Sequence, residues 1–264
     1  MPAKLPERIV CLTEETTETL YLLGEERRIV GISGYTVRPP RARREKPRVS
    51  AFLSAKNDAI LALRPDLVLG FSDLQADIAR DLAKAGLNIV LFNQRSVDEI
   101  LSMVLMLSSM VGAAERGRRL VEELEANLAD VRATAGRLRR RPKVYFEEWD
   151  EPMISGIRWV SELVEIAGGV DVFANLSHSQ AANGRIVNSD AVVAKQPDVM
   201  IASWCGKKFR PERVKARAGW DAVPAVRDGE LHEIKSAEIL QPGPAALTDG
   251  VRRLQAIISG WAEK

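Results

Sequence analysis

Short apolar runs alternate with amphipathic segments along the first third of the chain. Apolar runs that predict buried strands lie at residues 8–12, 28–33, 66–71 and 88–93. Helical patterns lie between them at residues 13–24, 57–64 and 75–86, and the second of these ends before Pro65. Alternation of strand and helix predicts a parallel sheet with helices on its faces, which is an α/β fold.

A long helical pattern follows, and a second alternating region comes after it. No proline interrupts the pattern from Val97 to Leu138, which predicts one long helix or two helices joined near Gly112. The strand–helix alternation resumes after Pro142 and continues to a last helix over residues 243–261. We therefore divide the chain into an N-terminal lobe (1–95), a linker helix region (96–141) and a C-terminal lobe (142–264).

A weak internal repeat indicates that the two lobes are similar. The segment NDAILALRPDLVLGFS (57–72) aligns with SDAVVAKQPDVMIASW (189–204), and each copy is a short helix, a Pro-Asp break and a buried strand. Five positions are identical between the copies, which makes two three-layer α/β lobes with mainly parallel sheets the expected architecture. Ligands of such folds bind at the carboxyl ends of the strands, and we expect them between the lobes.

Composition and charge exclude several classes of protein. The 264 residues include 38 basic and 36 acidic side chains, a balance that does not favour nucleic-acid binding. No apolar run approaches the roughly 20 residues that span a bilayer. Cys11 and Cys205 form no metal-binding or redox motif, so they are two buried thiols or one long-range bridge. Motifs of serine hydrolases, P-loop enzymes, zinc proteases and dinucleotide-binding enzymes are not found, and no metal site is expected.

Several segments together resemble a known family. RIVCLTEETTETLYLLGEERRIVGIS, NDAILALRPDLVLG, FEEWDEPMISGIRWVSELVEIAGGVDVF, WDAVPAVRDGELHEI and QPGPAALTDGVRRLQAII are similar, in this order, to the substrate-binding proteins of ABC importers for cobalamin and iron chelates. The third segment is most similar to the cobalamin-binding branch. The resemblance implies two lobes bridged by one long, rigid helix, and a corrinoid or a ferric or haem-type chelate as the ligand. It implies no intrinsic cofactor.

The ligand-binding candidates lie in loops that follow predicted strands. They combine aromatic rings, which stack on a flat macrocycle, with side chains that bind a carboxylate or phosphate. Tyr35 stands where the family has a tyrosine in its ligand site, whereas Arg38 stands where the cobalamin branch often has another aromatic residue. For the aromatic candidates the alternative is core packing, and for the carboxylates it is a solvated loop. The candidates are Glu15, Tyr35, Arg38, Phe52, Phe71, Gln75, Glu148, Trp149, Trp204 and Gln241.

The resemblance also implies a partner. Each lobe of the family presents an acidic residue to an arginine of the permease, and the aligned positions here are Asp58 and Asp190. The alternative is that these aspartates cap helices. We expect a monomer with a small-molecule ligand, and an ABC permease as the partner in uptake. A natural start at Met1 predicts a cytosolic relative, because no secretory signal precedes residue 8, whereas a removed signal predicts a periplasmic protein.

An enzyme is the alternative function. Glu14, Glu15, Glu147 and Glu148 are clustered acids that could act as general acids or bases between the lobes. Chelatases that act on metal tetrapyrroles have a broadly similar two-lobed architecture. No residue fixes a reacting atom in this sequence, so we expect a non-catalytic binding protein.

Overall fold

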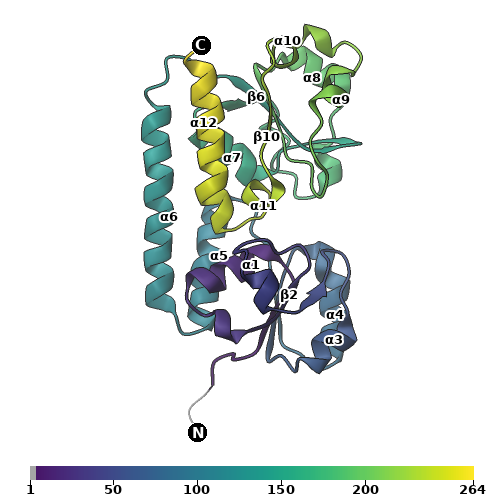
Figure 1. Ribbon diagram of the computed structural model, residues 1–264, viewed down its shortest axis with the longest axis vertical. Helices are drawn as coiled ribbons and strands as arrows, with labels where there is room; N and C mark the ends of the chain where they lie inside the picture. The colour runs from purple at the N-terminus through teal and green to yellow at the C-terminus, as the bar shows by residue number, and fades with distance from the viewer. Residues whose placement is uncertain (1–3) are drawn as a thin grey trace. The chain divides into compact units, whose positions relative to one another are not determined.

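The computed structural model describes residues 4–264 and contains two compact α/β units (Figure 1). Unit 1 consists of the chain up to Gln94 together with Asp98–Leu124, and unit 2 consists of Arg95–Val97 together with Glu125–Lys264. Two α/β lobes with mainly parallel sheets are thereby confirmed. The helical segment 96–141 is divided between the two units.

The sheet of unit 1 has five parallel strands in the order β3-β2-β1-β4-β5. They are β1 (Ile9–Cys11), β2 (Ile29–Ser33), β3 (Arg48–Ser50), β4 (Leu67–Phe71) and β5 (Ile89–Phe92). The order of the strands reverses at β1. The carboxyl end of β1 is therefore the topological switch point, where doubly wound sheets bind their ligands.

Helices pack on this sheet through their apolar faces. A core of Val10, Leu12, Val49, Ile60, Val68 and Leu82 is buried between sheet and helices. Short 3₁₀ turns span Glu26–Arg28 and Asp73–Gln75. The helices are α1 (Glu14–Leu22), α2 (Ala42–Glu45), α3 (Asn57–Ala62) and α4 (Ala76–Lys84).

The long helical pattern forms two helices joined near Gly112, which is the second of the two alternatives that the pattern left open. They are α5 (Val97–Met110) and α6 (Ala114–Ala135). Gly112 has a φ of +74° in the break, and the N–H groups of Gly112 and Ala113 turn back to the carbonyls of Ser109 and Ser108. This left-handed residue ends α5, because glycine adopts such a conformation without steric cost.

The sheet of unit 2 has the order β10-β9-β6-β7, and β8 also pairs with β6. Only β7 among the described strands is antiparallel, and it pairs with the carboxyl end of β6. As in unit 1, the first strand of the unit lies in the middle of its sheet. The strands are β6 (Lys143–Asp150), β7 (Met153–Ser155), β8 (Val170–Asp171), β9 (Val199–Ala202) and β10 (Leu231–Glu233).

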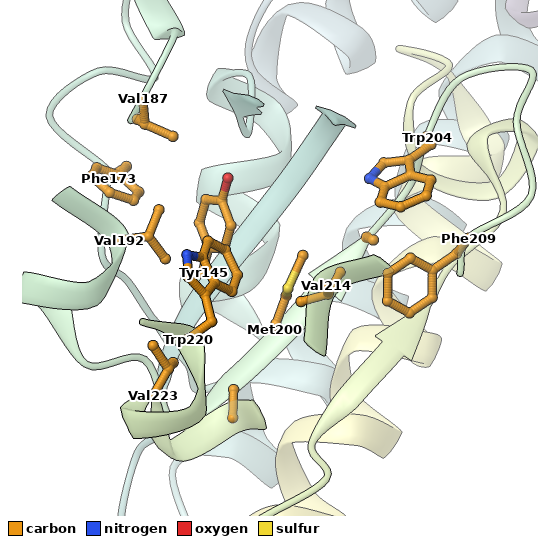
Figure 2. Close-up of a cluster of buried hydrophobic side chains, with 12 residues drawn as sticks. Tyr145, Phe173, Val187, Val192, Met200, Trp204, Phe209, Val214, Trp220 and Val223 are labelled. Carbon is orange, nitrogen blue, oxygen red and sulfur yellow. The ribbon is translucent and has the colours of Figure 1, made fainter. Parts of the chain in front are cut away.

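Aromatic side chains form much of the core of unit 2 (Figure 2). Tyr145 makes edge contacts with Phe173 and Trp220, and Trp204 makes one with Phe209. Turns of 3₁₀ helix span Ala182–Arg185 and Trp220–Ala222, and a π-helical turn spans Ala246–Gly250. The helices are α7 (Arg158–Ile166), α8 (Ser189–Lys195), α9 (Pro211–Lys215), α10 (Pro224–Arg227), α11 (Ser236–Ile239) and α12 (Val251–Ala262).

The internal repeat forms the same structure twice. In unit 1 the carboxylate of Asp66 accepts hydrogen bonds from the backbone N–H groups of Glu7 and Arg8, at 2.8 and 2.9 Å. In unit 2 the carboxylate of Asp198 accepts one from the N–H of Lys143 at 2.8 Å. Each Pro-Asp break thus holds the start of the central strand of its unit, which explains why both copies keep it.

Within residues 4–264, no helix is long and apolar enough to cross a membrane.

Candidate functional site

Three glutamates lie at the carboxyl end of β1, the switch point of unit 1. Glu14 and Glu15 begin α1, Glu18 follows one turn later, and none is more than 9% exposed. The Thr13 hydroxyl donates to Glu15 at 2.6 Å, and the Arg38 guanidinium binds Glu18 at 2.8 Å. We call Glu14, Glu15 and Glu18 the first acidic cluster.

Burial strongly favours the protonated form of two of these carboxylates. It raises the pKa of Glu14 from 4.5 to about 8, and the charges of Glu15 and Glu18 add to the rise. Burial also raises the pKa of Glu15 to about 7, although the hydrogen bond from Thr13 opposes the rise. The carboxyl groups of Glu14 and Glu15 therefore titrate near neutral pH.

The other candidates of unit 1 differ in how far they reach solvent. Tyr35, after β2, is 57% exposed and presents an aromatic surface. Gln75 is fully buried and acts as a clamp, because its side chain accepts from the Phe71 N–H at 3.0 Å and donates to the Phe52 carbonyl at 2.9 Å. Phe71 is buried and Phe52 is half-buried. Direct ligand contact by these residues stays a prediction.

The corresponding edge of unit 2 contains a second group of acids. Glu147 is fully buried at the carboxyl end of β6. Its carboxylate accepts hydrogen bonds from Arg217 at 2.7 and 2.9 Å, from the Tyr145 hydroxyl at 2.8 Å and from the Trp204 indole N–H at 2.9 Å. Glu147 therefore holds the Trp204 ring in place. The negative charge of Glu147 also raises the pKa of Arg217 further above its ordinary value, although burial opposes this rise.

Glu148 and Asp150 also face cations. Glu148 binds the buried Arg185 and accepts the Ile157 N–H at 3.1 Å. Asp150 accepts hydrogen bonds from Lys207 at 2.8 Å and Arg213 at 2.9 Å. Burial alone would raise the pKa of Asp150, but the hydrogen bond and charge of Lys207, together with the charge of Arg213, lower it. We call Glu147, Glu148 and Asp150 the second acidic cluster.

The aromatic candidates of unit 2 lie beside these acids. Trp149 is half-buried, its indole N–H donates to the Glu151 carbonyl at 2.8 Å, and the Lys207 ammonium lies 3.8 Å from its ring centre. Trp204 is 3% exposed and packs on Phe209 (Figure 2), so it belongs to the core as well as to this edge. Gln241 is half-buried after α11, and its carbonyl accepts the Gly243 N–H at 2.8 Å.

Each unit also contains a basic cavity beside its sheet. In unit 1 a cavity of about 580 Å³ beside β3 is lined by Arg43, Lys46, Arg48 and Lys56, among others. In unit 2 a cavity of about 510 Å³ is lined by Trp204, Lys207, Lys208, Arg210 and Arg213. Apart from Trp204, sequence reasoning missed these residues. The closely spaced cations that follow β9 and Trp204 in the sequence are the signal that could have identified the second cavity.

The two proposed docking residues occupy equivalent places in the repeat. Asp58 is the second residue of α3 and Asp190 the second residue of α8, and both are exposed. The N-cap of α8 is Asn188, whose side chain accepts the Ala191 N–H at 2.8 Å, and the N-cap position of α3 is Lys56. The aspartates therefore do not occupy the capping positions.

The described chain contains neither a metal site nor a disulfide. Among residues 4–264, no group of three or more His, Cys, Asp and Glu side chains could hold a metal ion. Cys11 is buried, which raises the pKa of its thiol to about 12, whereas Cys205 is exposed.

The arrangement of aromatic rings, buried acids and cations suits recognition of a polar ligand with a flat apolar face.

Comparison with known proteins identifies relatives over most of the chain. Residues 9–238 match the periplasmic binding protein family. A vitamin B12-binding protein of Vibrio cholerae (serotype O1) is 30% identical over 203 residues, which cover 75% of this chain and 70% of that protein. An ABC transporter substrate-binding lipoprotein of Bacillus subtilis (strain 168) is 24% identical over 266 residues, which cover 95% and 79%.

The fold is shared with solved structures. A periplasmic haem-binding protein from Roseiflexus sp. RS-1 superposes with a TM-score of 0.81 at 24% identity, and the match covers 96% of this chain and 99% of that one.

Proposed function

The chain belongs to the periplasmic binding protein family, and we propose that it binds a small metal chelate for ABC-type uptake without catalysing a reaction on it. The ligand is a corrinoid such as cobalamin, or a ferric or haem-type chelate. The observation that carries this proposal is the match over residues 9–238. It is supported by the 30% identical relative, which is a vitamin B12-binding protein. The aromatic rings and charged side chains at the carboxyl ends of the central strands add local support.

Tryptophan emission provides a direct test of ligand class, because the chain has five tryptophans. Cyanocobalamin, haemin and ferric citrate are titrated separately, and quenching is followed to saturation. We expect saturable binding of one class at micromolar or lower concentration. A folded protein that responds to none of the three would contradict the proposed function, with circular dichroism as the check on folding.

The proposal of a non-catalytic role is supported by the partners of the second acidic cluster. Glu147 is bound by Arg217 and Glu148 by Arg185, so neither carboxylate is available as a base in this arrangement. We propose that no intrinsic cofactor is held and that the chelate is cargo. Protoporphyrin incubated with Fe²⁺ or Zn²⁺ and the protein should show no faster metal insertion than without it. Insertion that Glu14→Gln abolishes would support the chelatase alternative instead.

Docking on a permease through Asp58 and Asp190 is the second part of the proposal. It is supported by their equivalent, exposed positions in the repeated helices of the two units. An Asp58→Ala/Asp190→Ala variant of the monomer should keep ligand affinity and lose stimulation of the ATPase of a co-expressed permease. Asp77→Ala is the matched control, because Asp77 is the exposed second residue of α4. Normal stimulation by the double variant would contradict docking through these residues.

A further inference from the structure

A basic cavity in unit 2 lies beside Trp204, just after the carboxyl end of β9. Its lining residues all come from the segment 204–213, which follows β9 and includes the start of α9. Its volume is about 510 Å³. Four of the five lining side chains are cations, and the fifth is an aromatic ring.

The positive charge of this cavity exceeds the negative charge next to it. Asp150 pairs with both Lys207 and Arg213, and the exposed Glu151 reaches Arg213 at 3.2 Å. Lys208 and Arg210 form no salt bridge within the part of the chain that the structure describes, although Lys208 lies near enough to Glu233, the partner of Lys235, to lower the pKa of that carboxyl. A cavity with two cations outside any salt bridge attracts an anion, and its low-dielectric wall concentrates the field.

The cavity is held in shape by residues behind it. Asp150 fixes Lys207 and Arg213, and Lys207 also lies over the Trp149 ring. Glu147 holds Trp204 through its indole N–H. Lys207 and Arg213 are therefore already positioned and lose little conformational entropy when an anion binds beside them.

The segment itself is also fixed at its middle. The Phe209 N–H donates to the Glu233 carboxylate at 3.2 Å, at the end of β10. The Phe209 ring packs against Trp204 (Figure 2). The backbone between Lys208 and Arg210 is therefore fixed at Phe209.

From this cavity we infer that the ligand carries an oxyanion, a carboxylate or a phosphate, which Lys208 and Arg210 bind beside Trp204. The inference rests on the proposed function and narrows its ligand class to anionic chelates. Arginine forms paired hydrogen bonds to an oxyanion, and lysine adds a point charge. Neutral analogues of the same macrocycle would leave these two cations without a partner.

Two pairs of probes separate the two oxyanions. Haemin carries two carboxylates that haemin dimethyl ester lacks, and cyanocobalamin carries a phosphodiester that dicyanocobinamide lacks. Wild-type protein should bind the anionic member of one pair roughly tenfold or more tightly than its counterpart, as expected for hydrogen bonds to charged groups. The pair that shows this difference identifies the oxyanion.

The Lys208→Ala/Arg210→Ala variant tests the residues. It should weaken binding of the anionic member roughly tenfold or more and leave binding of its counterpart unchanged. Lys195→Ala/Lys215→Ala is the matched control, because it also removes two exposed cations of unit 2 that do not line the cavity. Equal affinity within both pairs, or equal losses for both members of a pair, would overturn the anionic site and leave the proposed function in place.

Inorganic pyrophosphate tests the cavity without any chelate. Calorimetric titration should show binding to the wild type and to the control variant, and its loss in Lys208→Ala/Arg210→Ala. If no chelate binds while pyrophosphate still depends on Lys208 and Arg210, the proposed function is wrong and the anion site stands. If pyrophosphate binds all three proteins equally or none of them, the anion site is wrong.

Discussion

The two acidic clusters differ in their partners although they occupy equivalent places. Each lies at the carboxyl end of the central strand of its sheet, after β1 in unit 1 and at the end of β6 in unit 2. In the first cluster, hydroxyl and backbone groups contact Glu14 and Glu15, and their pKa values are raised. In the second, arginine and lysine bind Glu147 and Asp150, and the pKa of Asp150 is lowered.

The difference shows that burial alone does not decide the charge of a carboxylate. Removal from water penalises the ionised form in both units, and at Asp150 the hydrogen bond and charge of Lys207, with the charge of Arg213, outweigh that penalty. Glu14 and Glu15 can therefore take up protons near neutral pH, whereas in the second cluster Glu147 orders Trp204 and Asp150 holds two cations of the basic cavity. The carboxyl edge of the unit 1 sheet can therefore change its protonation with pH, whereas the carboxyl edge of the unit 2 sheet positions cations.

The largest expected effect comes from breaking the pair between Glu147 and Arg217. Arg217→Met leaves a fully buried carboxylate without its cation and should lower the free energy of unfolding by about 3–5 kcal/mol. Urea denaturation at pH 7 measures this change. Arg227→Met is the control, because Arg227 pairs with Asp228 on the surface, and it should leave stability almost unchanged. Similar stability of the two variants would mean that Glu147 does not need Arg217.

The second effect concerns the proton uptake of the first cluster. The folded-state pKa values of about 8 for Glu14 and about 7 for Glu15 exceed the ordinary value of 4.5. The folded protein therefore binds more protons than the unfolded chain between about pH 5 and pH 8, and stability falls as the pH rises through this window. Glu14→Gln/Glu15→Gln should remove this dependence and be more stable than the wild type by at least about 1–2 kcal/mol at about pH 9.

Urea denaturation between about pH 5 and pH 9 measures the dependence. Glu123→Gln, at an exposed position of α6, is the control and should reproduce the wild-type curve. Wild-type stability that stays constant over this range would show that neither carboxylate titrates there.

The third effect concerns Asp150 in the second cluster, whose contribution to stability depends on pH in the opposite direction to that of the first cluster. Asp150→Asn weakens the bonds to Lys207 and Arg213 and should cost about 1–2 kcal/mol at pH 7. Because the pKa of Asp150 is lowered in the folded protein, its stabilisation is present above the ordinary value of 3.8 and is lost as the pH falls below it. The difference between wild type and variant should therefore shrink in acid. Glu151→Gln, on the exposed neighbour, should have a much smaller effect.

The smallest effect is the contribution of one hydrogen bond, from Thr13 to Glu15, to the pKa of Glu15. Thr13→Ala removes the hydroxyl that donates to Glu15 at 2.6 Å, so the pKa of Glu15 should rise above about 7. Carbon-13 NMR titration of the Glu15 carboxyl measures the change. Thr13→Ser keeps a donor and should retain the wild-type value, and an unchanged value in the alanine variant would show that the hydroxyl is not what limits the shift.

Much of the fold could be predicted from the sequence because it depends on local patterns. The apolar runs at residues 8–12 and 66–71 became β1 and β4, and the Pro-Asp repeat became two equivalent helix–break–strand structures. The break near Gly112 was one of two alternatives, and in the structure the left-handed Gly112 and the backbone hydrogen bonds to the Ser108 and Ser109 carbonyls form it. Periodicity alone cannot distinguish a continuous helix from two that meet at one glycine.

The candidate site was predictable only in its location. The predicted strand ends identified Glu15, Glu148 and Trp204, because the carboxyl ends of parallel strands share one edge of a sheet. The expected loops are wrong for two of them, since Glu15 lies in α1 and Glu148 in β6. The sequence could not show that Gln75 clamps two backbone groups or that Glu147 holds Trp204. Those functions depend on contacts between residues that lie far apart in the chain.

The sequence by itself determined the family, the two α/β units and the edge of each sheet where the charged and aromatic candidate residues lie. Only the tertiary structure decided the partners and the burial of each carboxylate there. Glu147 meets Arg217 across 70 residues, whereas Glu14 and Glu15 are buried without a comparable cation in direct contact within the described chain. The physical reason is that desolvation and pairing depend on what packs around a group, and packing brings together residues that no local pattern relates.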